Sequence, residues 1–88
     1  MGNGFKSLIV WEKARDLAVD VYQVTGLGRF KQDYGLTDQM RRSAVSVPSN
    51  ISEGNERDTD KEAIRFFYIA KGSLAELRTQ LDIADRIN

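Results

Sequence analysis

Four basic residues lie close together between positions 29 and 42. Arg29 and Lys31 follow a glycine-rich stretch, and Arg41 and Arg42 are adjacent. Guanidinium and ammonium groups donate hydrogen bonds to phosphate oxygens, so these four side chains are candidates for contact with a nucleic-acid backbone. Neighbouring residues of a helix point about 100° apart, so Arg41 and Arg42 cannot both grip one phosphate. The alternative is that all four are ordinary solvated charges or form ion pairs between subunits.

Polar residues recur every three or four positions in the segment 43–53, and the segment 73–80 repeats this spacing. On helices, each set would form one polar edge. Two such edges can hydrogen-bond to each other and set the helix register, so we expect a network that includes Asn50 with Glu53, or Arg42 with Glu76. Substitution of Glu76 by alanine should then lower the melting temperature. The alternative is a solvated edge. The residues of the expected network are Ser43, Ser46, Asn50, Glu53, Ser73 and Glu76.

The chain contains neither cysteine nor histidine. Disulfides, thiolate metal ligands and a cysteine nucleophile are therefore excluded, and the commonest general base is missing. The acidic pairs Asp58/Asp60 and Asp82/Asp85 come without a nucleophile or a further ligand cluster. The stretches "GNGF" and "GLG" lack the strand–turn–helix context of a phosphate-binding loop. We therefore expect no catalytic residue, no metal, no cofactor and no small-molecule substrate.

The composition is that of one folded helical domain of 88 residues, with 41% hydrophobic and 30% charged residues. Thirteen Lys and Arg balance thirteen Asp and Glu. No net charge attracts the chain to nucleic acid or to an anionic membrane. The apolar run near the N-terminus, "LIVW", is too short for a signal peptide or a membrane span. We therefore expect a cytoplasmic protein.

Apolar residues recur with the helical period in three segments, and no strand-like alternation persists. Ser7 and Thr37 are expected to cap the first two helices, and Gly54 to follow the second. Pro48 should bend the second helix, because proline lacks the amide donor. The sequence thus predicts an all-α fold, an antiparallel up-down bundle in one domain over residues 1–88. The expected helices cover about 8–25, 37–53 and 59–87.

The third helix carries the longest apolar seam. Thr59 followed by Glu62 is a capping-box pattern at its start. A helix over 59–87 would be ~43 Å long, more than a partner of about 18 residues can cover. Either a further helix or other subunits should cover its exposed end. The seam steps by four and three through Ala63, Phe67, Ala70, Leu74, Leu77, Leu81 and Ala84, and we expect the core to rest on Trp11, Leu17, Leu74, Leu77 and Leu81.

Three segments resemble the 23S rRNA-intervening-sequence proteins, a bacterial family of four-helix bundles. They are "LIVWEKARDLAVDVYQVT", "YGLTDQMRRSAVSVPSNISEGNERD" and "FFYIAKGSLAELRTQLDIADRI". The resemblance spans residues 8–87, and its most specific parts are 35–57 and 72–77. It implies an up-down bundle that assembles as a ring-like homopentamer. Members are encoded within insertions in bacterial large-subunit ribosomal RNA genes and elsewhere, and some proteins related by fold bind nucleic acid through a basic pentameric surface.

The sequence departs from this family in two respects. Members usually continue into a fourth helix, whereas this sequence ends at Asn88. We therefore expect an incomplete bundle, which puts the pentamer in question and leaves a face for another copy. The balanced charge also differs from that of a basic nucleic-acid binder. The leading hypothesis is a non-catalytic, self-assembling protein that binds a macromolecule such as RNA or DNA. The alternative is a scaffold module with no affinity for nucleic acid.

Overall fold

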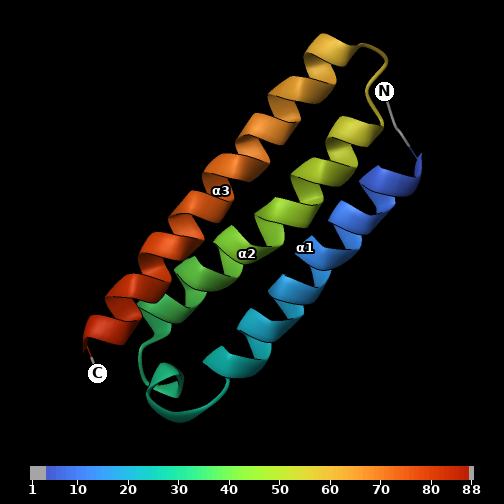
Figure 1. The fold of residues 1–88 in the computed structure, drawn as a ribbon. Helices are drawn as coiled ribbons and strands as arrows, with labels where there is room; N and C mark the ends of the chain where they lie inside the picture. Colours follow the sequence, from blue (N-terminus) through green and yellow to red (C-terminus); the bar gives the residue numbers. More distant parts are fainter. Residues whose placement is uncertain (1–3, 88) are drawn as a thin grey trace.

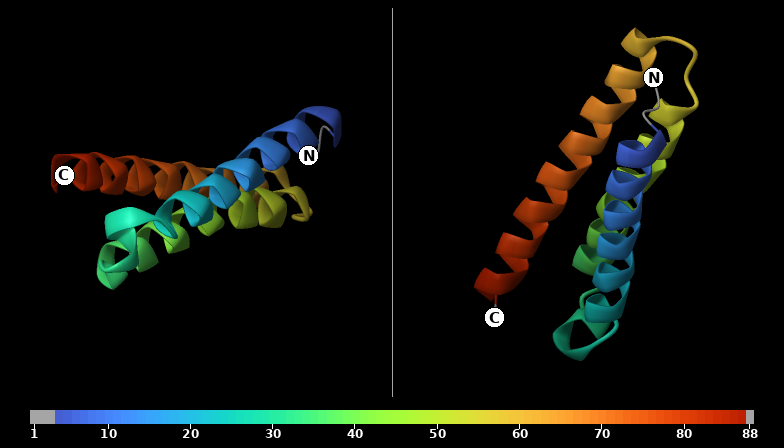
Figure 2. Two further views of the ribbon diagram at one scale, coloured as in Figure 1. Left: turned by 90° about the horizontal axis from the view of Figure 1, so that it is seen from below. Right: turned by 45° about the vertical axis from the view of Figure 1, so that its right-hand side comes forward.

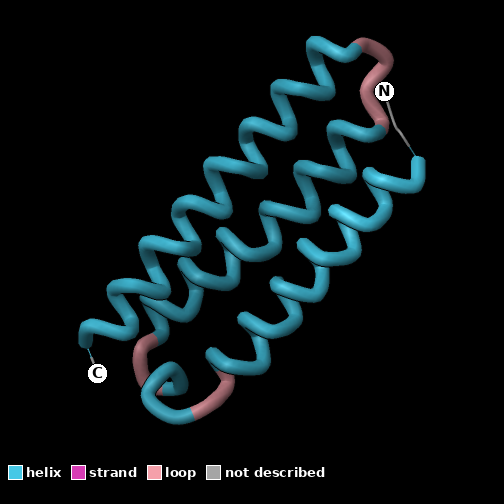
Figure 3. Tube along the Cα trace, in the orientation of Figure 1, coloured by secondary structure: helices cyan, strands magenta, loops and turns pink. Residues whose placement is uncertain are grey.

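The computed structural model describes residues 4–87, which contain helices and no strand. Figure 1 shows α2 lying between α1 and α3, with successive helices running in opposite directions. Short loops and one 3-10 helix, η1, join them (Figure 3). The protein is therefore all-α, and the order of its helices fits the predicted up-down arrangement. The elements are α1 Gly4–Thr25, η1 Gly28–Lys31, α2 Tyr34–Asn55 and α3 Asp60–Ile87.

The start of α2 differs from the prediction. The helix begins at Tyr34, and Asp33 is its N-cap, because Asp33 Oδ1 accepts a hydrogen bond from the Leu36 amide at 3.1 Å. Thr37, the predicted cap, lies inside the helix. Its hydroxyl donates to the carbonyl oxygen of Phe30 at 2.8 Å and so ties η1 to α2. The predicted start missed Tyr34, Gly35 and Leu36, because a glycine at the second position of a helix is typical of a loop.

The starts of the other two helices follow the sequence to different degrees. α1 begins at Gly4, so Ser7 lies within the helix and is not its cap. α3 begins after Thr59, as the capping-box pattern predicted. The Glu62 amide donates to Thr59 Oγ1 at 3.2 Å, and the Thr59 hydroxyl donates to the Glu62 carboxylate at 3.4 Å. One of the N-terminal amides of α3, that of Glu62, is thus satisfied by the side chain of the cap residue.

Gly54 lies inside α2, which ends at Asn55, and does not terminate the helix as predicted. A Cβ at this position would lie 2.5 Å from Phe67 Cε1 and 3.0 Å from the carbonyl oxygen of Ala63, both in α3. These distances are shorter than van der Waals contact. The missing side chain of Gly54 therefore permits α2 and α3 to approach each other closely.

Two clusters of buried apolar side chains join α2 to its neighbours, with Met40 and Leu77 the largest buried apolar residues. The predicted apolar stripe of α2 supplies most of both clusters. Trp11 and Leu17 are partly buried against them. Pro48 is buried, and α2 continues on both sides of it. The first cluster contains Ala18, Val21, Met40, Ala44 and Leu77, and the second contains Ala14, Val47, Ile51 and Ala70.

The apolar seam of α3 is only half buried. Its alanines and Leu77 face α2, but Leu74 and Leu81 remain 44% and 41% exposed. The reason is that α1 does not reach α3: over residues 4–87, no Cα of one helix lies within 8 Å of a Cα of the other. Figure 2 shows that the three helices form a twisted layer, in which the axes of α1 and α3 run at an angle. The expected core role of Leu74 and Leu81 is therefore wrong for the single chain.

Candidate binding surfaces

Arg41, one of the four candidate phosphate ligands, contacts the C-terminal end of α1. Its Nε donates to Thr25 Oγ1 at 2.9 Å, and its Nη2 donates to the carbonyl oxygen of Tyr22 at 3.3 Å. The guanidinium carbon lies 4.5 Å from the centroid of the Tyr22 ring. A cation at this position complements the C-terminal end of the helix dipole of α1, and its bond to Tyr22 adds to those that the same carbonyl oxygen accepts from the Gly26 amide and the Thr25 hydroxyl. These contacts account for Arg41 without any phosphate.

The other three candidate cations are exposed. Arg42 lies on a different side of α2 from Arg41, and its Nε donates to Asp38 Oδ2 at 3.0 Å on the surface. Arg29 and Lys31 both belong to η1, and no carboxylate of residues 4–87 forms an ion pair with either. The fold thus places Arg29 and Lys31 on one turn, η1, whereas Arg41 contacts α1.

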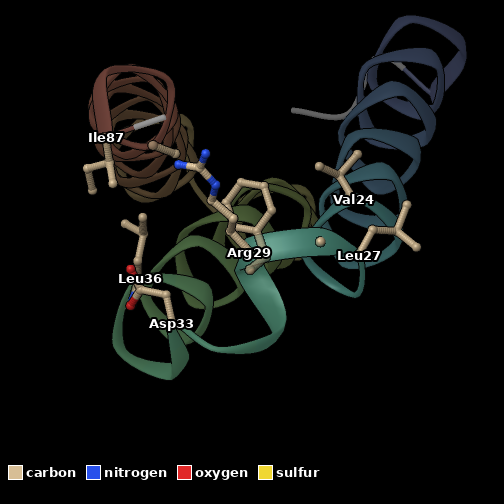
Figure 4. A pocket seen from close by; sticks show the side chains of 9 residues that line it. Val24, Leu27, Arg29, Asp33, Leu36 and Ile87 are labelled. Carbon is tan, nitrogen blue, oxygen red and sulfur yellow. The ribbon is translucent and has the colours of Figure 1, made fainter.

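A hollow of about 370 Å³ lies at the η1 end of the molecule (Figure 4). Arg29 and Asp33 are its charged residues. Asp33 is already engaged as the N-cap of α2. Apolar side chains from all three helical segments surround the hollow, including Val24, Leu36 and Ile87. The guanidinium group of Arg29 therefore has no ion-pair partner within residues 4–87 and lies among apolar side chains.

A chain of hydrogen bonds joins α2 to α3 through three of the predicted polar residues. The Ser73 hydroxyl donates to Ser46 Oγ at 2.8 Å. Asn50 Nδ2 also donates to Ser46 Oγ at 2.9 Å, and to the Ser46 carbonyl oxygen at 2.8 Å. Ser73 is buried and Ser46 is half-buried, so the bond between the two serines is partly shielded from water. These contacts specify one relative position of α2 and α3.

The remaining members of the predicted polar edge lie elsewhere. Ser43 is buried in α2. Glu53 forms an ion pair with Arg57, one turn further along the chain. Glu76 is exposed, and its carboxylate has no hydrogen-bond or ion-pair partner within residues 4–87. The expected pair of Arg42 with Glu76 is not formed, because Arg42 bonds within its own helix.

An apolar groove lies between α1 and α3, with α2 as its floor; we call it the α1/α3 groove. It has a volume of about 620 Å³. Its only charged lining residues in the described part of the chain are Lys6, Lys13 and Lys71. Asn55 lies at its margin, and Asn55 Oδ1 is buried without a hydrogen-bond partner. The apolar lining consists of Val10, Ala14, Leu17, Val47, Ile51, Phe67, Ala70 and Leu74. Leu74 of the α3 seam is exposed because it lines this groove.

Two further kinds of feature are absent from the described residues. No three acidic side chains gather closely enough there to hold a metal ion. None of the helices over 4–87 combines the length and apolar character that a membrane crossing requires. The groove, the end hollow and the cations of η1 are the candidate binding features of the described residues.

These features define a class of protein: small all-α proteins of antiparallel helices with an open apolar face. The sequence model of one family of proteins, the 23S rRNA-intervening sequence proteins, matches residues 6–88. The chain belongs to this family, and the resemblance noted in the sequence is confirmed. A comparison with curated proteins finds no match. The family description states no molecular activity, so the role of the chain has to be argued from its surfaces.

Proposed function

We propose that this chain is a non-catalytic protein that works by self-assembly, with the α1/α3 groove as the contact surface. The observation that supports the proposal is the exposure of Leu74 and Leu81 beside an apolar groove. Exposed leucines that flank an apolar concave surface are typical of protein interfaces. Covering side chains that are about two-fifths exposed contributes on the order of 1 kcal/mol each.

The size of the chain favours the same proposal. A domain of 88 residues buries a smaller fraction of its surface than a larger one does, so its stability alone is modest. The third helix lacks a neighbour on its groove side, since α1 does not reach it. Association that covers this side adds apolar burial that the single chain cannot supply, and it stabilises the folded state by mass action.

Native mass spectrometry and light scattering over a range of protein concentrations test this proposal. The parent chain should form a discrete multimer, and the double variant Leu74→Asn/Leu81→Asn should shift toward monomer while keeping its helical circular dichroism. Val45→Asn is the matched control, because Val45 is also 41% exposed but lies outside the groove. A parent chain that stays monomeric up to high concentration would refute self-assembly.

A second candidate function is binding of RNA or DNA by the assembled protein. The observation that favours it is the pair of exposed cations on η1, Arg29 and Lys31, which no carboxylate of the described chain neutralises. Arg42 would add a third cation, whereas Arg41 is engaged by α1. In an oligomer each copy repeats the patch, and several phosphate contacts made together give measurable affinity.

A salt titration distinguishes this candidate from a scaffold without nucleic-acid affinity. Binding of labelled RNA should weaken steeply between about 50 and 200 mM salt, and Arg29→Gln/Lys31→Gln should flatten that dependence. The control variant Lys61→Gln/Arg65→Gln removes the same charge from exposed positions near the start of α3. Equal loss in both variants would indicate unspecific attraction, and no binding at low salt would exclude the candidate.

A further inference from the structure

The hollow at the η1 end of the molecule is bounded by residues from two distant parts of the chain. One wall comes from the end of α1, from η1 and from the start of α2, and the other comes from the last turn of α3. Figure 4 shows the side chain of Arg29 projecting into the space between Val24 and Ile87. The volume of the hollow, about 370 Å³, is at the lower end of the range for small-molecule sites. A small ligand can therefore be held between the two walls.

Most of the lining of the hollow is apolar, and much of it is open to water. Leu27 and Ile87 are among the most exposed apolar side chains of the described residues, at 65% and 61%. Phe30 and Leu36, by contrast, are partly buried against the first core cluster. A ligand with an apolar body would cover the exposed side chains and remove their apolar surface from water. The lining therefore favours a ligand that carries a hydrocarbon chain or ring.

The hollow contains a cation without a partner. The guanidinium of Arg29 forms no ion pair with any carboxylate of residues 4–87. Asp33, the other charged residue of the lining, is the N-cap of α2 and accepts a hydrogen bond from the Leu36 amide. The planar guanidinium of an arginine can donate two parallel hydrogen bonds to one carboxylate. Arg29 therefore favours an anionic ligand, and a carboxylate matches the geometry of its donors.

The surroundings of Arg29 favour a ligand with a single negative charge. The carboxylate of Asp33 belongs to the same lining. The last turn of α3 also borders the hollow, and the carbonyl groups at a helix C-terminus carry about half a negative charge. Arg29 can balance one anionic group, but these two neighbours oppose a second negative charge on the ligand. A monocarboxylate is therefore favoured over a doubly charged phosphate ester.

We propose that the hollow is a binding site for a small monocarboxylate with an apolar body, a medium-chain fatty acid. Its carboxylate bonds to the guanidinium of Arg29, and its hydrocarbon chain lies against Val24, Leu27 and Ile87. The hollow and the α1/α3 groove share no lining residue, so the site is additional to self-assembly and does not rest on it. The site also differs from the proposed RNA contact, because Lys31 does not line the hollow.

Titration of the full chain with octanoate, followed by two-dimensional NMR of the backbone amides, locates the ligand. Octanoate should bind saturably with a dissociation constant of about 1 mM or lower. The largest amide shifts should fall within residues 24–36 and 84–87, which line the hollow. Acetate, which lacks the hydrocarbon chain, should bind at least about tenfold more weakly. Largest shifts at Val10 and Leu74 would place octanoate in the α1/α3 groove and overturn the proposal.

Three substitutions separate the contribution of the charge from that of the apolar walls. Arg29→Gln should weaken the binding of octanoate about three- to tenfold and leave that of neutral 1-octanol within about twofold of the parent. Ile87→Asn should weaken the binding of both ligands, because it removes apolar surface from one wall. Lys31→Gln is the matched control: Lys31 belongs to η1 but lies outside the hollow, so octanoate binding should stay within about twofold.

Circular dichroism confirms that each variant keeps its helices before binding is compared. Saturable binding with these responses supports the site for any number of copies, so its outcome is read separately from the test of self-assembly. Equal weakening by Arg29→Gln and Lys31→Gln would show that octanoate responds only to the general positive charge of η1, and the site would be refuted. Unchanged binding in Arg29→Gln, or no saturation up to about 5 mM octanoate, would refute it as well.

Discussion

At the scale of single residues, two adjacent arginines have entirely different surroundings. Arg41 reaches from α2 to the last turn of α1, where it bonds to Thr25 and to the carbonyl oxygen of Tyr22. Arg42 bonds to Asp38 on the exposed side of its own helix. Hydrogen bonds from a charged group to a helix end hold two elements together, whereas exposed ion pairs contribute little.

We therefore predict that Arg41→Ala lowers the free energy of unfolding by about 1–2 kcal/mol, because it removes the charged hydrogen bond to Thr25 and the contact with the Tyr22 ring, which together connect α2 to α1. Arg42→Ala should lower it by no more than about 0.5 kcal/mol. Urea denaturation followed by circular dichroism measures both values. Equal effects of the two substitutions would show that Arg41 does not connect α2 to α1.

At the scale of elements, the contact between α2 and α3 depends on a position without a side chain. Gly54→Ala should lower the free energy of unfolding by about 1–3 kcal/mol, because the new methyl group would overlap Phe67 and approach the Ala63 carbonyl. Gly72→Ala is the control. A Cβ at Gly72 meets nothing within 4 Å, so alanine should stabilise α3 by about 0.5–1 kcal/mol. If both variants were more stable than the parent, the close approach would be refuted.

The hydrogen bond between Ser46 and Ser73 is a second contact that aligns α2 with α3. Ser73→Ala should lower the free energy of unfolding by about 0.5–1.5 kcal/mol, since a partly buried hydrogen bond between two helices is lost. Glu76→Ala should change it by less than about 0.5 kcal/mol, which reverses the expectation from sequence. Thermal melts of the two variants, side by side with the parent, decide between the buried serine and the exposed glutamate as the residue that sets the register.

At the scale of the whole molecule, the three helices form a layer with one open side. A single chain is 43 × 19 × 16 Å in its principal dimensions, and the groove runs beside an edge helix. A layer of this kind leaves α3 with a neighbour on one side only. The stability of the chain should therefore depend on protein concentration, because another chain can cover this open side of α3.

We predict that the melting temperature of the parent chain rises by about 2–4 °C for each tenfold increase in protein concentration, as expected for a folded multimer in equilibrium with unfolded monomers. The double variant Leu74→Asn/Leu81→Asn should lose this dependence. Differential scanning fluorimetry can follow Trp11, which is partly buried against the second core cluster. A melting temperature independent of concentration would mean that the open side is stable in water.

Local patterns in the sequence predicted the helices and part of the polar network, but not the partners of every polar residue. The stripe of α2 and the Thr59 cap depend on contacts within one or two helical turns, so their spacing revealed them. Ser46, Asn50 and Ser73 were also expected to share a network, and the structure connects them. The roles of Arg41 and Glu76 could not be predicted, because each depends on which groups of another helix come within reach.

The fold class, the family and the three helices could be predicted from the sequence alone, because helical periodicity depends on residues that are close together in the chain. Only the tertiary structure decided which side of each helix is covered. The seam of α3 has one uniform spacing, yet half of it faces α2 and half faces the groove, because α1 is too far away to cover it. The burial of a side chain depends on the neighbouring helices, so it cannot be predicted from the spacing of residues within a single helix.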